Sequence, residues 1–127
     1  MDDELVSVRY MVDDVEAAIA FYTGRFGFEV GQNASPAFCE VTRGRLRLLL
    51  AGPKSSAGRP MPDGRVPEPG GWNRIHFVVD DIDAEVERLR SAGVTFRNDV
   101  ISGPGGRQIL LEDPAGNPIE LFEPARP

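Results

Sequence analysis

Hydrophobic and polar residues alternate near the start of the chain and again after its midpoint. In each segment the two sets of alternate positions differ: Val6, Val8, Tyr10 and Val12 against Ser7, Arg9 and Met11, then Ile75, Phe77 and Val79 against Arg74, His76 and Val78. A period of two residues predicts a β-strand with two different faces. Asp13-Asp14 follows the first segment and recurs 67 residues later as Asp80-Asp81. The chain therefore contains two copies of one pattern.

Each acidic pair begins a predicted helix. Asp14 and Asp81 are suited to cap the helix that follows, because a short carboxylate accepts hydrogen bonds from the free N–H groups of the first turn. Apolar residues then recur at three- and four-residue spacing: Val15, Ala18, Ile19 and Tyr22 in the first copy, Ile82, Val86 and Leu89 in the second. Gly27 and Gly93 lie near the predicted helix ends.

Three further strands are predicted after each helix. They span about 28–32, 37–42 and 45–51 in the first copy and 94–97, 107–112 and 118–123 in the second. Arg43-Gly44 and Asp113–Asn117 supply hairpin turns. The prediction is thus an α+β protein of two βαβββ modules, about 1–52 and 72–127. Residues 53–71, rich in Pro and Gly, would form a linker or a mobile flap.

Composition narrows the class of protein. The 127 residues are 41% hydrophobic, enough for one sizeable core without a second independent domain. A net charge of −6 argues against a nucleic-acid partner. No apolar run reaches the length of a membrane span, and Met1-Asp2-Asp3-Glu4 lacks the basic start of a signal peptide, so we expect a cytoplasmic protein without a membrane partner. The single Cys39 stands in an apolar segment and is expected to be an unreactive buried thiol.

Two motifs carry a family resemblance. They are Val12-Asp13-Asp14-Val15-Glu16-Ala17-Ala18-Ile19-Ala20-Phe21-Tyr22 and, closing the second copy, Glu112-Asp113-Pro114-Ala115-Gly116-Asn117-Pro118-Ile119-Glu120-Leu121-Phe122. With the tandem repeat, the chain resembles the vicinal oxygen chelate superfamily of glyoxalases, bleomycin-resistance proteins and extradiol dioxygenases. The resemblance implies an open, partly closed barrel-like sheet around a concave pocket, helices on the outer face, and a homodimer.

Enzymes of that superfamily hold a divalent metal with residues of the first and last strands of each module. By resemblance, the first-strand positions fall on Ser7 and Arg74, and the last-strand positions on Leu48 and Glu120. Only Glu120 is an effective ligand, because Leu48 has no donor atom, Arg74 is a permanent cation and Ser7 is a weak neutral ligand. We therefore expect no metal and no cofactor.

The remaining polar candidates allow alternatives. His76 lies on the same strand face as Arg74, so it is either a displaced ligand, general base or hydrogen-bond donor, or it simply pairs with a carboxylate such as Glu120 or Glu40. Arg74 and Glu120 are expected to form an internal ion pair in place of the metal. Trp72 either plugs the sheet edge or stacks on a ligand. The Gly-rich residues 102–106 are expected to form a flexible loop at the pocket mouth.

These observations favour a metal-independent binding protein that sequesters a bulky, partly aromatic natural product or antibiotic. Such a role needs a mostly apolar concavity with a few polar groups. The residues predicted to line it are Ser7, Arg9, Phe38, Leu48, Leu50, Trp72, Arg74, His76, Glu120 and Phe122. The alternative is an isomerase, lyase or dioxygenase of the same superfamily that uses His76 and Glu120.

Overall fold

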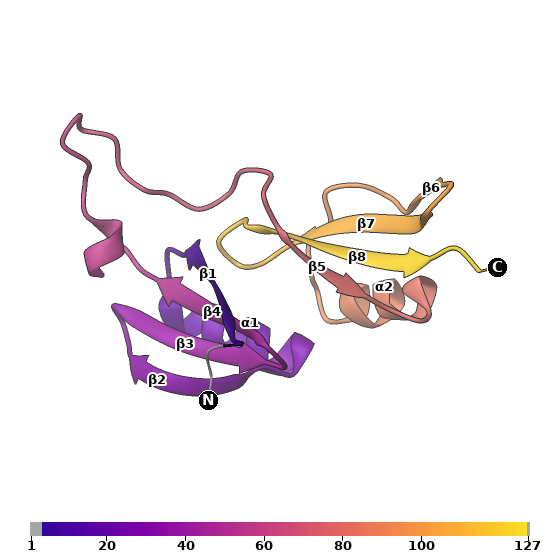
Figure 1. The fold of residues 1–127 in the computed structure, drawn as a ribbon, viewed down its shortest axis with the longest axis horizontal. Helices are drawn as coiled ribbons and strands as arrows, with labels where there is room; N and C mark the ends of the chain where they lie inside the picture. Colours follow the sequence, from indigo (N-terminus) through magenta and orange to yellow (C-terminus); the bar gives the residue numbers. More distant parts are fainter. Residues whose placement is uncertain (1–3, 127) are drawn as a thin grey trace. The chain divides into compact units, whose positions relative to one another are not determined.

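The secondary structure follows the repeat along the chain. A computed structural model describes residues 4–126 (Figure 1). Residues 1–3, which entered the signal-peptide argument, lie outside the described residues. The chain divides into two compact units, with the boundary between Gly70 and Gly71. Across residues 4–126, no helix combines the length and the hydropathy required to cross a membrane.

The first unit contains one βαβββ module. Its elements are β1 (Val6–Met11), α1 (Val15–Phe26), β2 (Glu29–Ala34), β3 (Phe38–Arg43) and β4 (Leu46–Ala51). The strand order is β1-β4-β3-β2, with β1 parallel to β4 and the other pairs antiparallel. A short 3-10 helix, Ser56–Gly58, follows β4. There the Ser55 Oγ donates a hydrogen bond of 2.7 Å to the Gly52 carbonyl, which anchors the start of the intervening segment to the end of β4.

The second unit repeats this arrangement. Its elements are β5 (Ile75–Val78), α2 (Ile82–Ser91), β6 (Ile101–Gly103), β7 (Gly106–Glu112) and β8 (Pro118–Pro124). The strand order β5-β8-β7-β6 matches that of the first sheet, and β5 is again parallel to the last strand. The predicted α+β class and the two βαβββ modules are therefore confirmed.

Both predicted helix caps are present. The Asp14 Oδ1 accepts a hydrogen bond of 3.1 Å from the Ala17 N–H, and the Asp81 Oδ1 accepts one of 3.1 Å from the Ala84 N–H. Gly27 ends α1 with a φ of 69°, a left-handed conformation that costs glycine little because it has no Cβ. Short local signals thus account for where each helix begins and where α1 ends.

The predicted strand over 94–97 is wrong. Phe96 makes only an isolated bridge to Leu111, and the edge strand of the second sheet is Ile101–Gly103. The cause lies at Asn98, whose side-chain Oδ1 accepts a hydrogen bond of 2.9 Å from the Leu110 N–H. The Asn98 side chain takes the place of a backbone acceptor, so the backbone pairing with β7 stops there. The chain pairs with β7 again only after a loop, at β6.

Each sheet has one face covered by its own helix and one face free of it. Figure 1 shows α2 lying along one face of the second sheet. Apolar side chains on the covered faces are completely buried: Val41, Leu48 and Leu50 with α1, and Ile109, Leu111, Ile119 and Leu121 with α2. The alternate positions of the same strands point to the opposite, open face, because successive side chains alternate along a strand. Most of the predicted site residues lie on these open faces.

Candidate ligand-binding site

In the first unit, three predicted site residues share the open face. Ser7 and Arg9 are exposed on β1, and Phe38 is half-buried on β3. Ser7 is next to Arg47 in the sheet register, and the Arg47 Nε donates a hydrogen bond of 2.9 Å to the Ser7 Oγ. The Ser7 hydroxyl therefore faces a guanidinium, which disfavours a cation at this position.

Leu48 and Leu50 were predicted to line a pocket, and the structure corrects this placement. Both side chains are completely buried on the face that α1 covers. Arg9 lies opposite Leu49, while its counterpart in the repeat, His76, lies opposite Glu120. Leu49 is therefore the residue that corresponds to Glu120. Counting from the hairpin turn of each copy had assigned this position to Leu48, one residue too early. A shift of one residue moves a side chain to the other face of the sheet.

In the second unit, Glu120 organises the polar side chains of the open face. Its Oε1 accepts hydrogen bonds from the Arg74 Nε at 3.0 Å and lies 2.9 Å from the Arg74 Nη2. Its Oε2 lies 3.6 Å from the His76 Nε2. The Glu120 side chain is only 10% exposed, against 29% for Arg74 and 44% for His76. The predicted Arg74–Glu120 ion pair is thus present, and His76 stands beside the same carboxylate.

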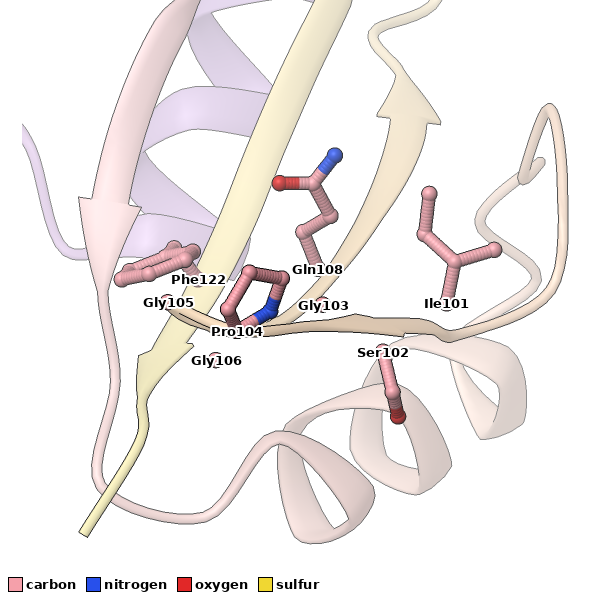
Figure 2. Close-up of a pocket in the computed structure, with 8 residues that line it drawn as sticks. All are labelled: Ile101, Ser102, Gly103, Pro104, Gly105, Gly106, Gln108 and Phe122. Atoms are coloured by element: carbon pink, nitrogen blue, oxygen red, sulfur yellow. The ribbon is translucent and has the colours of Figure 1, made fainter.

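An aromatic wall continues from this polar cluster. The rings of His76 and Phe122 have centroids 5.1 Å apart and planes inclined by 35°. Phe122 also lines a pocket of about 230 Å³ formed mainly by the β6–β7 hairpin (Figure 2). The flexible loop predicted over residues 102–106 is wrong in part: Ser102 and Gly103 belong to β6 and Gly106 to β7, so only Pro104 and Gly105 form the turn beside this pocket. The three polar residues, Phe122 and the pocket therefore form one continuous strip within the second unit.

Trp72 is not a core residue. It is 69% exposed, and the Arg97 guanidinium lies 4.8 Å from the centre of its ring. Arg97 also donates hydrogen bonds of 2.9 Å to the carbonyls of Gly71 and Gly116 and forms an ion pair of 2.8 Å with Glu112. Arg97 therefore holds the indole in place from one side and leaves it largely open to solvent.

The residues at the superfamily's metal positions do not fit a divalent metal. Ser7, Arg74 and the residue opposite Arg9, Leu49, supply no anionic or imidazole donor. The remaining carboxylate, Glu120, is neutralised by a guanidinium at hydrogen-bond distance. Throughout the part of the chain that the structure describes, no three His, Cys, Asp or Glu side chains are grouped as a metal site requires.

Cys39 offers no nucleophile. It is completely buried on the covered face of the first sheet. Burial raises the pKa of the Cys39 thiol above its ordinary value, and the nearby Glu40 carboxylate raises it further. A protonated, inaccessible thiol is unreactive, as predicted from the apolar sequence around it.

Sequence reasoning did not identify Gln108 or Arg97. Gln108 lies in a correctly predicted strand, four residues before Glu112, and the two side chains therefore share one face of the sheet. Strand alternation alone was therefore enough to place its side chain on the open face. Nothing in the sequence near Arg97 indicated its contacts, because its partners Gly71, Glu112 and Gly116 are brought together by the fold.

Solved structures with the same fold include proteins of different activities. A superfamily member from Sphaerobacter thermophilus is 32% identical over 94% of this chain and 95% of its own, with a TM-score of 0.74. Lactoylglutathione lyase from Agrobacterium tumefaciens is 27% identical over 94% and 92%, with a TM-score of 0.71. TnmS3, an antibiotic binding protein from Streptomyces sp. CB03234, is 27% identical over 95% of each chain, with a TM-score of 0.70.

The family assignment rests on the sequence as well as the fold. No curated protein sequence matches this chain. A family model does match residues 4–121, from before β1 into the last strand, β8. The chain belongs to the Glyoxalase/Bleomycin resistance protein/Dioxygenase superfamily.

Proposed function

We propose that this protein binds and sequesters a bulky, partly aromatic natural product, such as an antibiotic, without a metal. The observation that carries the proposal is the engagement of Glu120 by Arg74 through contacts of 3.0 and 2.9 Å. An Arg carboxylate pair of this kind satisfies the charge that a metal would otherwise neutralise. A divalent ion at Glu120 would have to displace the guanidinium and would find no second strong ligand in the positions that the superfamily uses.

The open face of the second sheet suits an aromatic ligand. It joins fixed polar groups at Arg74, His76 and Glu120 to the Phe122 ring and to the pocket of about 230 Å³. Small-molecule sites commonly combine apolar and aromatic walls with a few polar groups that set orientation. Trp72, 69% exposed and held by Arg97, adds a second aromatic surface in this unit. The antibiotic-binding relative TnmS3, at 27% identity, supports this class of ligand.

Ser7, Arg9 and Phe38, on the open face of the first sheet, are proposed as binding residues of the first unit by itself. A homodimer and a cytoplasmic location, both expected from the sequence, also belong to the proposal. Size-exclusion chromatography with light scattering tests the dimer, which would elute at twice the 13.9 kDa chain mass.

One observation favours an enzyme as the second candidate. The His76 Nε2 lies 3.6 Å from the Glu120 Oε2, and a histidine beside a carboxylate is an arrangement that moves protons. Lactoylglutathione lyase from Agrobacterium tumefaciens, 27% identical, is an enzyme of the same fold. In that alternative, His76 is the proton donor or acceptor and Glu120 orients its ring.

A thermal-shift screen with aromatic natural products tests the proposal. Protein treated with a chelator is expected to gain melting temperature with at least one compound, because a ligand that binds only the folded state stabilises it by mass action. His76→Phe retains the aromatic packing on Phe122 and removes the imidazole. This variant is expected to weaken binding without abolishing it if the protein sequesters, and to lose turnover if the protein is an enzyme. A screen in which no compound stabilises the protein contradicts the proposal.

A further inference from the structure

A single amide stands in an otherwise apolar row across the open face of the second sheet. The β6–β7 register pairs Ile101 with Gln108, and the β7–β8 register pairs Gln108 with Phe122. The β5–β8 register extends the row to Val78. Residues paired in adjacent strands point to the same face of a sheet. Gln108 is therefore flanked on both sides by hydrophobic side chains.

Ile101, Gln108 and Phe122 line a pocket that lies within the second unit. Figure 2 shows the Gln108 side chain directed to the same side of the hairpin as Ile101, with Phe122 and Pro104 beside it and Ser102 directed to the opposite side. The pocket volume is about 230 Å³, below the ~300 Å³ at the lower end of drug-sized sites. It therefore holds one end of a bulky compound.

The Gln108 amide has no hydrogen-bond partner among the residues that the structure describes. Its side chain is half-buried and lines the pocket. A primary amide offers one acceptor oxygen and two N–H donors. When a ligand displaces water from an apolar pocket, a polar group left unpaired is penalised, so the ligand that binds well must pair with it.

We propose that the Gln108 pocket recognises a planar cyclic amide edge, an N–H beside a C=O in a flat ring. The Gln108 oxygen accepts from the ring N–H, one Gln108 N–H donates to the ring carbonyl, and the ring packs against Phe122. This proposal rests on the proposed function and names the part of the ligand that enters the second unit.

Two features of the walls select this chemistry. Every residue that lines the pocket is uncharged, so the pocket favours a neutral group over an ion. The Phe122 ring and the Pro104 ring border the space on one side of the amide, which favours a flat ligand over a branched one. Gln108 is thus a specificity-determining residue, because a site that pairs a ligand's N–H discriminates strongly against the analogue that lacks it.

Gly105 provides a way to close the pocket without touching the polar cluster. A Cβ added to Gly105 would lie 3.9 Å from the Phe122 Cζ, an ordinary contact distance, and Gly105 does not adopt a positive φ. Gly105→Val therefore fills the space in front of Phe122 without backbone strain. Asp99→Val is the matched control, because it places the same side chain in the loop before β6, at a position that is 98% exposed and does not line the pocket.

The experiment is an NMR titration of the ¹⁵N-labelled full chain with quinolin-2(1H)-one and, separately, its N-methyl derivative. We expect the amide signals of residues 101–108 to shift with quinolin-2(1H)-one, and the N-methyl derivative to bind roughly fivefold more weakly, since one net hydrogen bond is lost. Gln108→Leu is expected to abolish this difference. Gly105→Val is expected to remove binding of both compounds, whereas Asp99→Val leaves it unchanged.

Equal affinity of the wild-type chain for both compounds overturns the recognition of an amide edge, and this comparison needs no variant to fold. Signal changes confined to residues other than 101–108 and Phe122, or none at millimolar concentration, overturn the pocket assignment. Neither result affects the sequestration proposal, which the screen of complete natural products tests separately. A natural product that binds while Gly105→Val leaves its affinity unchanged likewise retains the function and rejects the pocket.

Discussion

At the level of single residues, Glu120 bears on both candidate functions, metal-independent binding and enzymatic catalysis. It is the one effective ligand among the superfamily's metal positions, and it is the buried member of a cluster with Arg74 and His76. A carboxylate that is 10% exposed requires compensation of its charge, since an unpaired buried charge is costly. Arg74 supplies that compensation from a side chain that is 29% exposed. Arg74 therefore balances the charge of Glu120 within the second unit.

Glu120→Gln is expected to destabilise the fold by roughly 1–3 kcal/mol, because it leaves the Arg74 cation partly buried without its partner. The double variant Arg74→Met with Glu120→Gln is expected to recover much of this loss. Urea unfolding of the wild type, both single variants and the double variant measures the coupling. Additive single effects would mean that the 2.9 Å contact contributes no stability.

Individual residues were predictable where strand alternation alone decides their direction. His76 and Glu120 were assigned to one face, and the register places them side by side. Leu48 was misassigned because it was counted from the turn, and the loops of the two modules differ by one residue in the distance from turn to strand. Gln108 was overlooked because an isolated glutamine carries no distinctive sequence signal, although its position in β7 was known.

Arg97 shows how one side chain organises several elements. It forms contacts with the segment before β5, with Glu112 at the end of β7, and with the β7–β8 turn at Gly116. Its side chain is only 17% exposed. Because the same guanidinium covers one face of Trp72, the orientation of the exposed indole depends on these hydrogen bonds.

Arg97→Ala is therefore expected to lower stability by about 1–3 kcal/mol and to alter the fluorescence of Trp72, the only tryptophan. Arg90→Ala is the control. The Arg90 guanidinium also lies over an aromatic ring, Phe96 at 5.2 Å, but its side chain is 52% exposed and its ion pair with Asp99 is long at 3.8 Å. Chemical unfolding measures the stability of both variants, and emission spectra measure the change in Trp72 fluorescence. An Arg97→Ala protein with unchanged emission would show that Trp72 is held by other contacts.

Secondary-structure elements with local signals were predicted well. The Asp caps, the glycine after α1 and the apolar spacing of both helices all act within a few residues of one another. The strand predicted over 94–97 was wrong because the pairing there depends on the hydrogen bond between Asn98 and Leu110. These two residues are not neighbours in the sequence, so the local pattern did not indicate the contact. Local patterns do not reveal which backbone groups a distant side chain will satisfy.

At the scale of the whole molecule, the internal repeat carried the fold prediction. Two copies of one pattern form two sheets with the same strand order, so a single recognised motif accounted for both. The repeat does not determine activity, because one fold can carry many different functions. The differences between the copies, at Ser7 against Arg74 and Leu49 against Glu120, carry the functional information.

Zinc, nickel, manganese and iron are each expected to leave the melting temperature unchanged. A metal that bound the folded state would raise the melting temperature through mass action. Of the four positions that bind metal in superfamily enzymes, only Glu120 is an effective ligand. Thermal unfolding with each metal, against a chelator-treated reference, measures the effect. Stoichiometric metal retained through purification, and lost in Glu120→Gln, would contradict the metal-independent account.

The central claim is that the protein holds its ligand without a metal and without converting it. The most direct measurement is equilibrium dialysis of chelator-treated protein with a natural product found in the screen, followed by quantification of the compound released on denaturation. We predict stoichiometric binding and full recovery of the unchanged compound. A product that accumulates with time, or binding that appears only after a divalent metal is added, would contradict the claim.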